Sequence, residues 1–374
     1  MMESASAVEG VELWAVNTDV QALSRNMAPN KLTIGQRTSR GLGAGGSPDV
    51  GAKAAEESRA DIAEMVSEAD LVFVTAGMGG GTGSGAAPII AELSKQAGAL
   101  TIGVVTKPFG FEGRKRMQQA RGAIMEMKSR VDTLIVVSND KLLSIVPEAT
   151  PLTDAFLVAD DILRQGVVGI SEIIIKPGLV NVDFADVRTI MSNAGTALMG
   201  IGTGKGKNRA TDAALAAISS PLLDFPITKA KGIVFNIVGG SDMSLQEINS
   251  AAEVIYQNVD SDANIIFGAL VDEKNNISGE VSITVLATGF ATDFFDINEN
   301  NDEPSKESSA QTKGKKVVKA VKEEEVDEVI TYPKTVGKGN PKTTSIDQIT
   351  RNTRPKKKGG LRSFLKKIFG WILG

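Results

Sequence analysis

Short apolar runs alternate with longer amphipathic stretches over the first half of the chain. Runs of four to six residues are typical of buried strands, and the stretches between them have helical periodicity, as in Asp49–Ala69 and Ala86–Gly98. Strand followed by helix, repeated, predicts a parallel α/β sheet that binds its ligands at the carboxyl ends of the strands. The predicted strands are Val11–Val16, Leu71–Val74, Leu100–Val105 and Thr133–Val137.

The pattern changes in the middle of the chain. A long helix is predicted over Thr153–Ile175, where Pro177 and Gly178 end it. From about Gly195 onward, strands alternate with the helix Ser244–Gln257, which predicts a second, smaller mixed domain. Its predicted strands are Gly232–Val238, Ala263–Ala269 and Val281–Thr288.

Beyond Phe290 the chain is rich in Asn, Glu, Ser and Lys and has little apolar content, which predicts a disordered linker. The expected divisions are 1–152 for the first α/β domain, 153–194 for the central helix and the loop after it, 195–292 for the second domain, 293–355 for the linker and 356–374 for a tail.

The tail differs in charge from the rest of the chain. From Arg351 onward there are eight Lys and Arg and no acid, whereas the preceding residues carry 33 basic and 45 acidic side chains. Apolar residues recur there at helical spacing with Lys366 and Lys367 opposite, which predicts a basic amphipathic helix for an anionic membrane surface. The alternatives are docking to a membrane-anchor protein and a tail without a binding role. The apolar positions are Leu361, Phe364, Leu365, Ile368, Phe369 and Ile372.

Composition restricts the chemistry. The chain has no cysteine and no histidine, so disulfides and thiolate metal sites are excluded and zinc chemistry is not expected. A general base must therefore be Asp, Glu or a positioned water. No apolar run approaches the ~20 residues that span a bilayer, and no signal peptide is visible.

The segment from Gly77 to Gly85 reads Gly-Met-Gly-Gly-Gly-Thr-Gly-Ser-Gly between a predicted strand and a predicted helix. Glycine amides can approach a ligand closely, and amides at a helix N-terminus bind anions, so this loop is predicted to hold a polyphosphate. It is not a P-loop, because no lysine follows it. The dinucleotide fingerprint over Gly41–Gly46 lacks a clear preceding strand, and the P-loop-like Gly200–Gly206 lacks the required Ser or Thr.

Two motifs in the correct order carry a family resemblance. Gly79–Gly85 is similar to the signature loop GGGTG(T/S)G of the tubulin/FtsZ family, and Asn181–Asp186 resembles the synergy loop of FtsZ. The resemblance extends from about Glu9 to Phe290. It implies a Rossmann-like parallel-sheet GTPase domain, a long central helix and a smaller mixed α/β domain.

The resemblance also implies which residues contact GTP. The residues alone also permit other roles. Glu112 and Arg116 could form an i, i+4 ion pair, Asn139 could be a turn residue, and Phe156 could be a core residue. The implied contacts are Gly79, Gly80, Gly81, Thr82, Gly83, Ser84 and Gly85 with Gly43, Ala44 and Gly45 for the phosphates, Glu112 and Arg116 for ribose and phosphate, and Asn139, Phe156 and Asp160 for guanine.

The implied catalytic residues are Asn181, Asp183 and Asp186. Carboxylates three residues apart share one helical face, and beside an amide they can orient a water. The local alternative makes Asp183 an N-cap and Asp186 a favourable first-turn charge. In the family this loop completes the site of the next subunit, so hydrolysis of GTP to GDP and phosphate requires a head-to-tail filament. Mg²⁺ is expected on the phosphates, with no ligand from the protein.

The implied function is a GTPase that polymerises into the division (Z) ring of a bacterium or plastid, in the cytoplasm or stroma, without a nucleic-acid partner. Met1–Ser4 aligns with the middle of the family's first helix, so the first strand and first glycine loop are expected to be missing. The alternative is a non-hydrolysing or truncated form that copolymerises with a full-length FtsZ. Val11–Asp19 and Gly41–Pro48 most resemble cyanobacterial and plastid FtsZ. An ordinary dinucleotide-dependent enzyme would leave Asn181–Asp186 unexplained.

Overall fold

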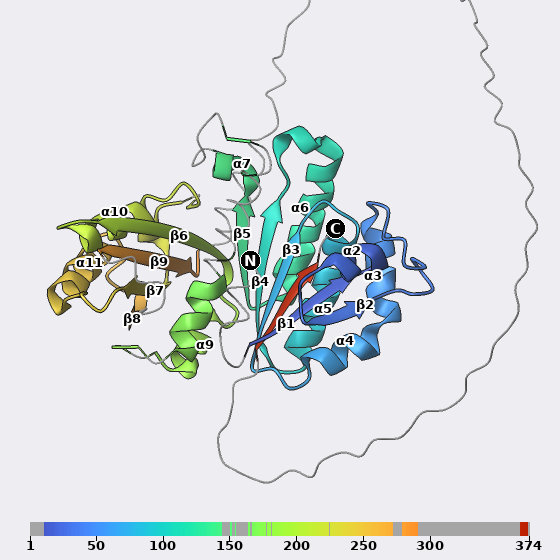
Figure 1. Cartoon of the computed structure of the whole chain (residues 1–374), viewed down its shortest axis with the longest axis horizontal. Helices are drawn as coiled ribbons and strands as arrows, with labels where there is room; N and C mark the ends of the chain where they lie inside the picture. Colours follow the sequence, from blue (N-terminus) through green and yellow to red (C-terminus); the bar gives the residue numbers. More distant parts are fainter. Residues whose placement is uncertain are drawn as a thin grey trace, which may run out of the picture. The chain divides into compact units, whose positions relative to one another are not determined.

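The computed structural model describes residues 11–143, 150, 151, 154, 164, 167–176, 178–180, 182–223, 225–271, 279–290 and 367–372 (Figure 1). Its described strands join edge to edge in the order β2-β1-β10-β3-β4-β5-β6-β9-β7-β8. The strands from β2 to β5 are all parallel to their neighbours and form the first sheet. They are β1 (Val11–Asn17), β2 (Asn30–Thr33), β3 (Leu71–Gly77), β4 (Leu100–Lys107), β5 (Thr133–Ser138) and β10 (Lys367–Ile372).

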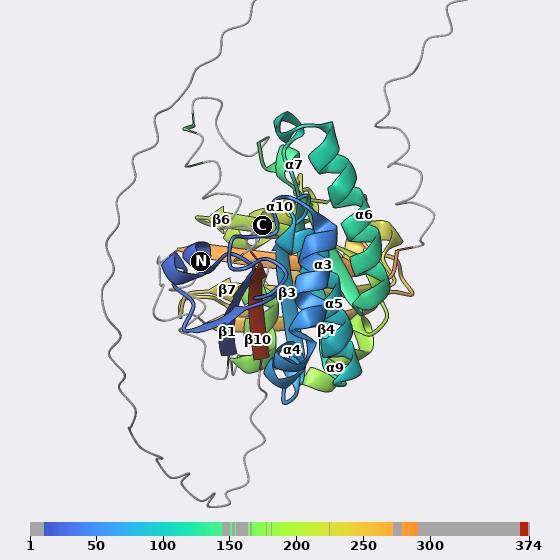
Figure 2. The ribbon, with the colours of Figure 1, turned by 90° about the vertical axis from the view of Figure 1, so that its right-hand side faces the viewer.

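Helices cover both faces of the first sheet. Figure 2 shows α3, α5 and α6 crossing in front of the strands, and residues 167–175 and α9 pack on the other face. Successive residues of β3 join opposite cores, with Val72 on the α5 side and Phe73 on the other, so the strand is apolar throughout. The covering helices are α3 (Pro48–Glu57), α4 (Arg59–Val66), α5 (Thr82–Gln96), α6 (Arg114–Arg130) and α9 (Phe184–Met191).

The second domain is a smaller mixed sheet. β6 begins parallel to β5 and then continues antiparallel to β9, which pairs antiparallel with β7, and β7 pairs parallel with β8. Its elements are β6 (Gly195–Lys205), α10 (Arg209–Ile218), β7 (Gly232–Gly239), α11 (Leu245–Gln257), β8 (Asn264–Val271) and β9 (Glu280–Thr288). Shorter elements of the chain are α2 (Val20–Arg25), η1 (Gly110–Glu112), α7 (Asn139–Leu143) and η2 (Ile227–Lys229).

Glycines at every second position of β6 explain the P-loop-like stretch. A Cβ added at Gly200, Gly202 or Gly204 would collide with backbone atoms of α10. The glycines therefore allow α10 to pack directly on the strand, and this stretch belongs to the core of the second domain.

The predicted α/β architecture is confirmed, and each predicted strand is present with slightly different ends. The helical stretch predicted over Asp49–Ala69 is confirmed over most of its length, as two helices, α3 and α4, that meet at Ser58. The buried hydroxyl of Ser58 accepts a hydrogen bond from the Gly35 amide at 3.0 Å, which fixes the break. The predicted central helix is described at 154, 164 and 167–175, all helical.

The amphipathic helix predicted for the tail is wrong where the structure describes it. Lys367–Ile372, which includes Ile368, Phe369 and Ile372, is strand β10 between β1 and β3. Backbone hydrogen bonds to a neighbouring strand on each side favour the strand. In so short a segment, the spacing of apolar residues is compatible with either a helix or a strand. Leu361, Phe364, Leu365, Lys366 and the predicted linker 293–355 lie outside the described residues.

A buried ion cluster connects α10 and α11. The guanidinium of Arg209 is 2.6 Å from Glu247 and 2.7 Å from Asp242, and its side chain is only 6% exposed. Arg209 lowers the pKa of Glu247 to about 2, with further hydrogen bonds from Ser244. The same contacts raise the pKa of Arg209. The cluster therefore stabilises the second domain in its ionised form.

We expect Glu247→Gln to lower the free energy of unfolding by about 1–3 kcal/mol at pH 7, because Arg209 loses a charged partner in a buried site. The folded pKa of Glu247 lies below its usual 4.5, so its contribution is complete above pH 4.5 and is lost as the pH falls towards 2. Urea unfolding at pH 7 and pH 3 measures the difference. Lys205→Ala, which breaks an exposed ion pair with Glu280, is the matched control and should cost less than about 1 kcal/mol. An equal loss in both variants would contradict this assignment.

Candidate nucleotide-binding site

The glycine loop follows β3 and ends at the N-terminus of α5. The first hydrogen bond of this helix runs from the amide of Gly85 to the carbonyl of Gly81, so the amides of the preceding turn have no acceptor within the helix. Gly79 has φ +98°, and its amide donates to Ser84 Oγ at 2.8 Å. The loop thus presents helix N–H groups at the carboxyl end of a parallel strand, the usual place for an anion.

The second predicted phosphate loop lies directly against the first. A Cβ at Gly81 would come within 2.7 Å of Ala44 Cβ and 2.9 Å of the Ser47 amide. Gly45 and Gly46 have φ values of +59° and +73°, and nothing lies within 4 Å of where their Cβ atoms would be. The fold therefore brings the two glycine-rich segments together, with open space beside the second.

Sequence reasoning missed the segment that connects the two loops. Thr18, which is fully buried after β1, shares a hydrogen bond of 2.6 Å with Thr82 through the two hydroxyls. The carbonyl of Thr18 accepts from the Gly43 amide at 3.2 Å, and Asp19 caps α2. The available signal was a run of polar residues, Asn17 to Asp19, at the carboxyl end of a predicted strand.

Glu112 and Arg116 form an ion pair of 3.0 Å beside the glycine loop. Glu112 also accepts from the Phe109 amide at 2.8 Å. A Cβ at Gly79 would lie 2.7 Å from both Cγ and the carbonyl oxygen of Arg116, so this arginine borders the loop. The ion-pair role is therefore present, and the ligand contact stays a prediction.

Asn139 follows β5 at the same edge of the sheet. Its Oδ1 is buried and accepts no hydrogen bond from the residues that the structure describes. An unsatisfied buried acceptor needs an explanation, and a donor on a bound base is one that fits. Nearby, burial lowers the pKa of Lys141, and the charge of Lys107 lowers it further. The two lysines therefore lie close together at this edge of the sheet.

The predicted catalytic carboxylates lie at the opposite edge. Arg188 of α9 donates to the carbonyl of Gly98, just before β4, and Met191 accepts from Thr133 at the start of β5. Asp183, directly before α9, and Asp186, in its first turn, are both exposed. In the described part of the chain, Asp183 occupies the N-cap position without a side-chain capping hydrogen bond.

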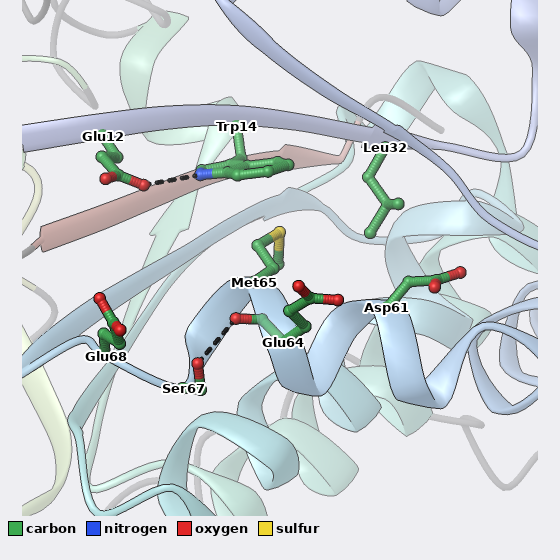
Figure 3. A pocket seen from close by; sticks show the side chains of 8 residues that line it. All are labelled: Glu12, Trp14, Leu32, Asp61, Glu64, Met65, Ser67 and Glu68. Carbon is green, nitrogen blue, oxygen red and sulfur yellow. Dashed lines mark hydrogen bonds between the residues drawn. The ribbon is translucent and has the colours of Figure 1, made fainter. Parts of the chain in front are cut away.

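Figure 3 shows a pocket between β1, β2 and α4, away from the glycine loop. Trp14 and Met65 lie within it, and the Trp14 indole donates to Glu12 at 3.3 Å. Four carboxylates line it, those of Glu12, Asp61, Glu64 and Glu68. A pocket with this lining repels polyphosphate, so it is not the nucleotide site.

Three predicted site residues, Phe156, Asp160 and Asn181, lie outside the described residues. Within the described ranges, the structure contains no helix long and apolar enough to cross a membrane. Nor do the described acidic side chains gather into a cluster that could hold a metal ion.

Comparisons with known proteins agree with this fold. Residues 3–147 match the tubulin/FtsZ family GTPase domain, and residues 195–291 match the FtsZ family C-terminal domain. A solved structure described as an empty FtsZ dimer from M. jannaschii is 44% identical, with a TM-score of 0.73 over 76% of this chain and 82% of that one. A solved point mutant of FtsZ from M. jannaschii is also 44% identical, with a TM-score of 0.74 over 77% and 86%. GDP-bound CetZ1 from Haloferax volcanii, at 22% identity and TM-score 0.63 over 74% and 84%, shows the fold alone.

A parallel sheet with a glycine loop at a helix N-terminus, joined to a smaller mixed sheet, is the architecture of the tubulin-like GTPases. The GTPase domain of this class binds GTP and GDP. The chain belongs to the FtsZ family.

Proposed function

We propose that this chain hydrolyses GTP as part of a head-to-tail filament, with Asp183 and Asp186 of one subunit acting on the nucleotide of the next. The observation that carries the proposal is the separation of the two half-sites. The glycine loop follows the carboxyl end of β3, whereas α9 contacts the amino ends of β4 and β5. Strands of eight residues, such as β4, span roughly 25 Å, so these carboxylates cannot reach their own nucleotide.

Stacking subunits along the direction of the strands would bring α9 of one subunit next to the glycine loop of its neighbour. A heterologous contact that does not close generates an open polymer in which each interface contains one loop and one α9. Related solved structures support this arrangement, because one is described as an FtsZ dimer and another as a CetZ2 protofilament bound to GTPγS.

The chain's own residues supply three contributions. The amides at the start of α5 bind and orient the phosphates, and the helix dipole favours their negative charge. Asn139, with its unsatisfied acceptor, recognises the guanine edge together with the predicted Asp160 and Phe156. The exposed carboxylates of Asp183 and Asp186 orient the attacking water and accept its proton, and no histidine is available for that role.

The cellular role that we propose is assembly of the division ring of a bacterium or plastid. Support comes from membership of the FtsZ family and from the proposed polymer. Binding of the tail to an anionic membrane or to an anchor protein stays a prediction, and it requires Lys367–Ile372 to leave the sheet.

The first test is GTP turnover by the full chain across protein concentrations, with pelleting in parallel. We expect no turnover below a threshold concentration and a rate proportional to the excess above it, because each site needs two subunits. Turnover per molecule that is independent of concentration would contradict the shared site. Assembly without turnover would favour a non-hydrolysing form that copolymerises with another FtsZ.

A further inference from the structure

One side chain of α9 connects this helix, which carries the predicted catalytic carboxylates, to the end of α5. The guanidinium of Arg188 donates a hydrogen bond of 2.7 Å to the carbonyl of Gly98, just beyond the last turn of α5. The same guanidinium lies over the ring of Phe184, with 5.5 Å between Cζ and the ring centroid. Figure 2 shows α9 beside the lower end of α5. Arg188 therefore links the first turn of α9 to the first domain.

The other end of α9 is held by different contacts. The carbonyl of Met191 accepts a hydrogen bond of 2.6 Å from the buried hydroxyl of Thr133, at the start of β5. Lys95, in the last turn of α5, donates at 3.1 Å to Asn193, which lies beyond the end of α9. These contacts fix the last turn of the helix and do not reach its first turn.

The position of Arg188 on the helix determines how it can act. Residues four apart lie on the same face of a helix, whereas residues two apart do not. Arg188 therefore shares a face with Phe184 and not with Asp186. Phe184 is partly buried against the core and directly follows Asp183. Arg188 thus contacts the turn that carries the carboxylates without lying beside Asp186, and any effect on that carboxylate passes through the helix.

We propose that Arg188 is a positioning residue for GTP hydrolysis. Its two contacts hold the first turn of α9, and with it Asp183 and Asp186, in the orientation that acts on the nucleotide of the next subunit. This role rests on the function proposed above. The glycine loop lies at the other end of α5, so the contact with Gly98 ties both half-sites to one helix of 15 residues, about 22 Å long. The spacing must be fixed, because every filament interface combines one half-site of each kind.

Arg188→Ala removes both contacts, and steady-state GTP turnover above the assembly threshold measures the effect. We expect kcat to fall by about 10- to 100-fold, because a misplacement of catalytic groups by about 1 Å can have an effect of this size. KM for GTP and the GTP dissociation constant should be unchanged, because α9 lies at the edge of the sheet opposite the glycine loop.

Two further variants separate positioning from a general loss of structure. Arg188→Lys keeps the charge and a donor for the Gly98 carbonyl, so its kcat should lie between those of Arg188→Ala and the unmodified chain. Arg130→Ala is the matched control and should retain kcat. It removes an arginine at the end of α6 whose ion pairs, both of 3.4 Å, are with Glu92 and Glu126 on α5 and α6.

Hydrogen exchange reports on the first turn of α9 independently of turnover. The amides of Asp186 and Val187 donate to the carbonyl of Asp183 and should exchange faster in Arg188→Ala than in the unmodified chain. Unchanged exchange of these amides would overturn the role of Arg188. So would a kcat equal to that of Arg130→Ala, a raised KM with unchanged kcat, or a kcat of Arg188→Lys no higher than that of Arg188→Ala. Retained turnover in Asp186→Ala would instead contradict the proposed function itself.

Discussion

Asp186→Ala is expected to abolish GTP turnover while GTP binding is retained. Asp186 is exposed on α9, at the edge of the sheet opposite the glycine loop, so its removal leaves the nucleotide contacts of its own chain intact. Loss of a residue that orients water and accepts its proton lowers the rate by about 10²–10⁴-fold. The measurement is steady-state phosphate release above the assembly threshold, together with the GTP dissociation constant.

The control for this variant is Asp212→Ala. Asp212 is also an exposed acid in the first turn of a helix, α10, so both variants lose the same type of favourable dipole interaction, worth about 0.3–1 kcal/mol. Asp212→Ala should retain turnover. Weakened GTP binding by Asp186→Ala, or equal loss of turnover in the two variants, would contradict a site shared between subunits.

Gly79→Ala is expected to weaken GTP binding by at least about tenfold, which corresponds to about 1.4 kcal/mol. Gly79 has φ +98°, where a side chain is strained, and its Cβ would lie 2.7 Å from Cγ and the carbonyl oxygen of Arg116. Relief of this collision must displace either the loop or α6, and both border the phosphate site. Titration with a fluorescent GTP analogue measures the effect.

Gly98→Ala is the matched control for Gly79→Ala. Gly98 has φ +87° at the other end of α5, and nothing lies within 4 Å of its Cβ position. The substitution costs a similar backbone strain of about 1 kcal/mol in stability, without a collision near the loop. GTP affinity should be unchanged. Equal weakening by both variants would mean that strain in α5, and not the geometry of the loop, determines affinity.

A mixture of the two defective variants tests the shared site directly. Asp186→Ala subunits retain the glycine loop, and Gly79→Ala subunits retain Asp186. At GTP concentrations below the dissociation constant of Gly79→Ala, some interfaces of a mixed filament combine the intact half of each variant, so turnover should exceed the sum of the two variants measured alone. Absence of recovery in pellets that contain both variants would contradict completion of the site by the adjacent subunit.

Local sequence patterns predicted most of the fold, because the spacing of apolar residues shows which positions are buried in each strand and helix. The run Leu71–Val74 is apolar at every position since β3 is covered on both faces, and the helix Ser244–Gln257 carries its own capping box. The break at Ser58 was not predictable, because it depends on a hydrogen bond to Gly35, which is 23 residues away.

The sequence by itself determined the class of this protein and indicated which residues to expect at its site. Phosphate binding requires glycines in the loop and polar residues after the strands, and these are local features, so the sequence alone shows them. Only the tertiary structure decided which segments meet. It placed Thr18 against Thr82, α9 at the edge opposite the glycine loop, and Lys367–Ile372 between β1 and β3. Such contacts depend on sheet order, and strand pairing between distant segments leaves no periodic signal in either segment alone.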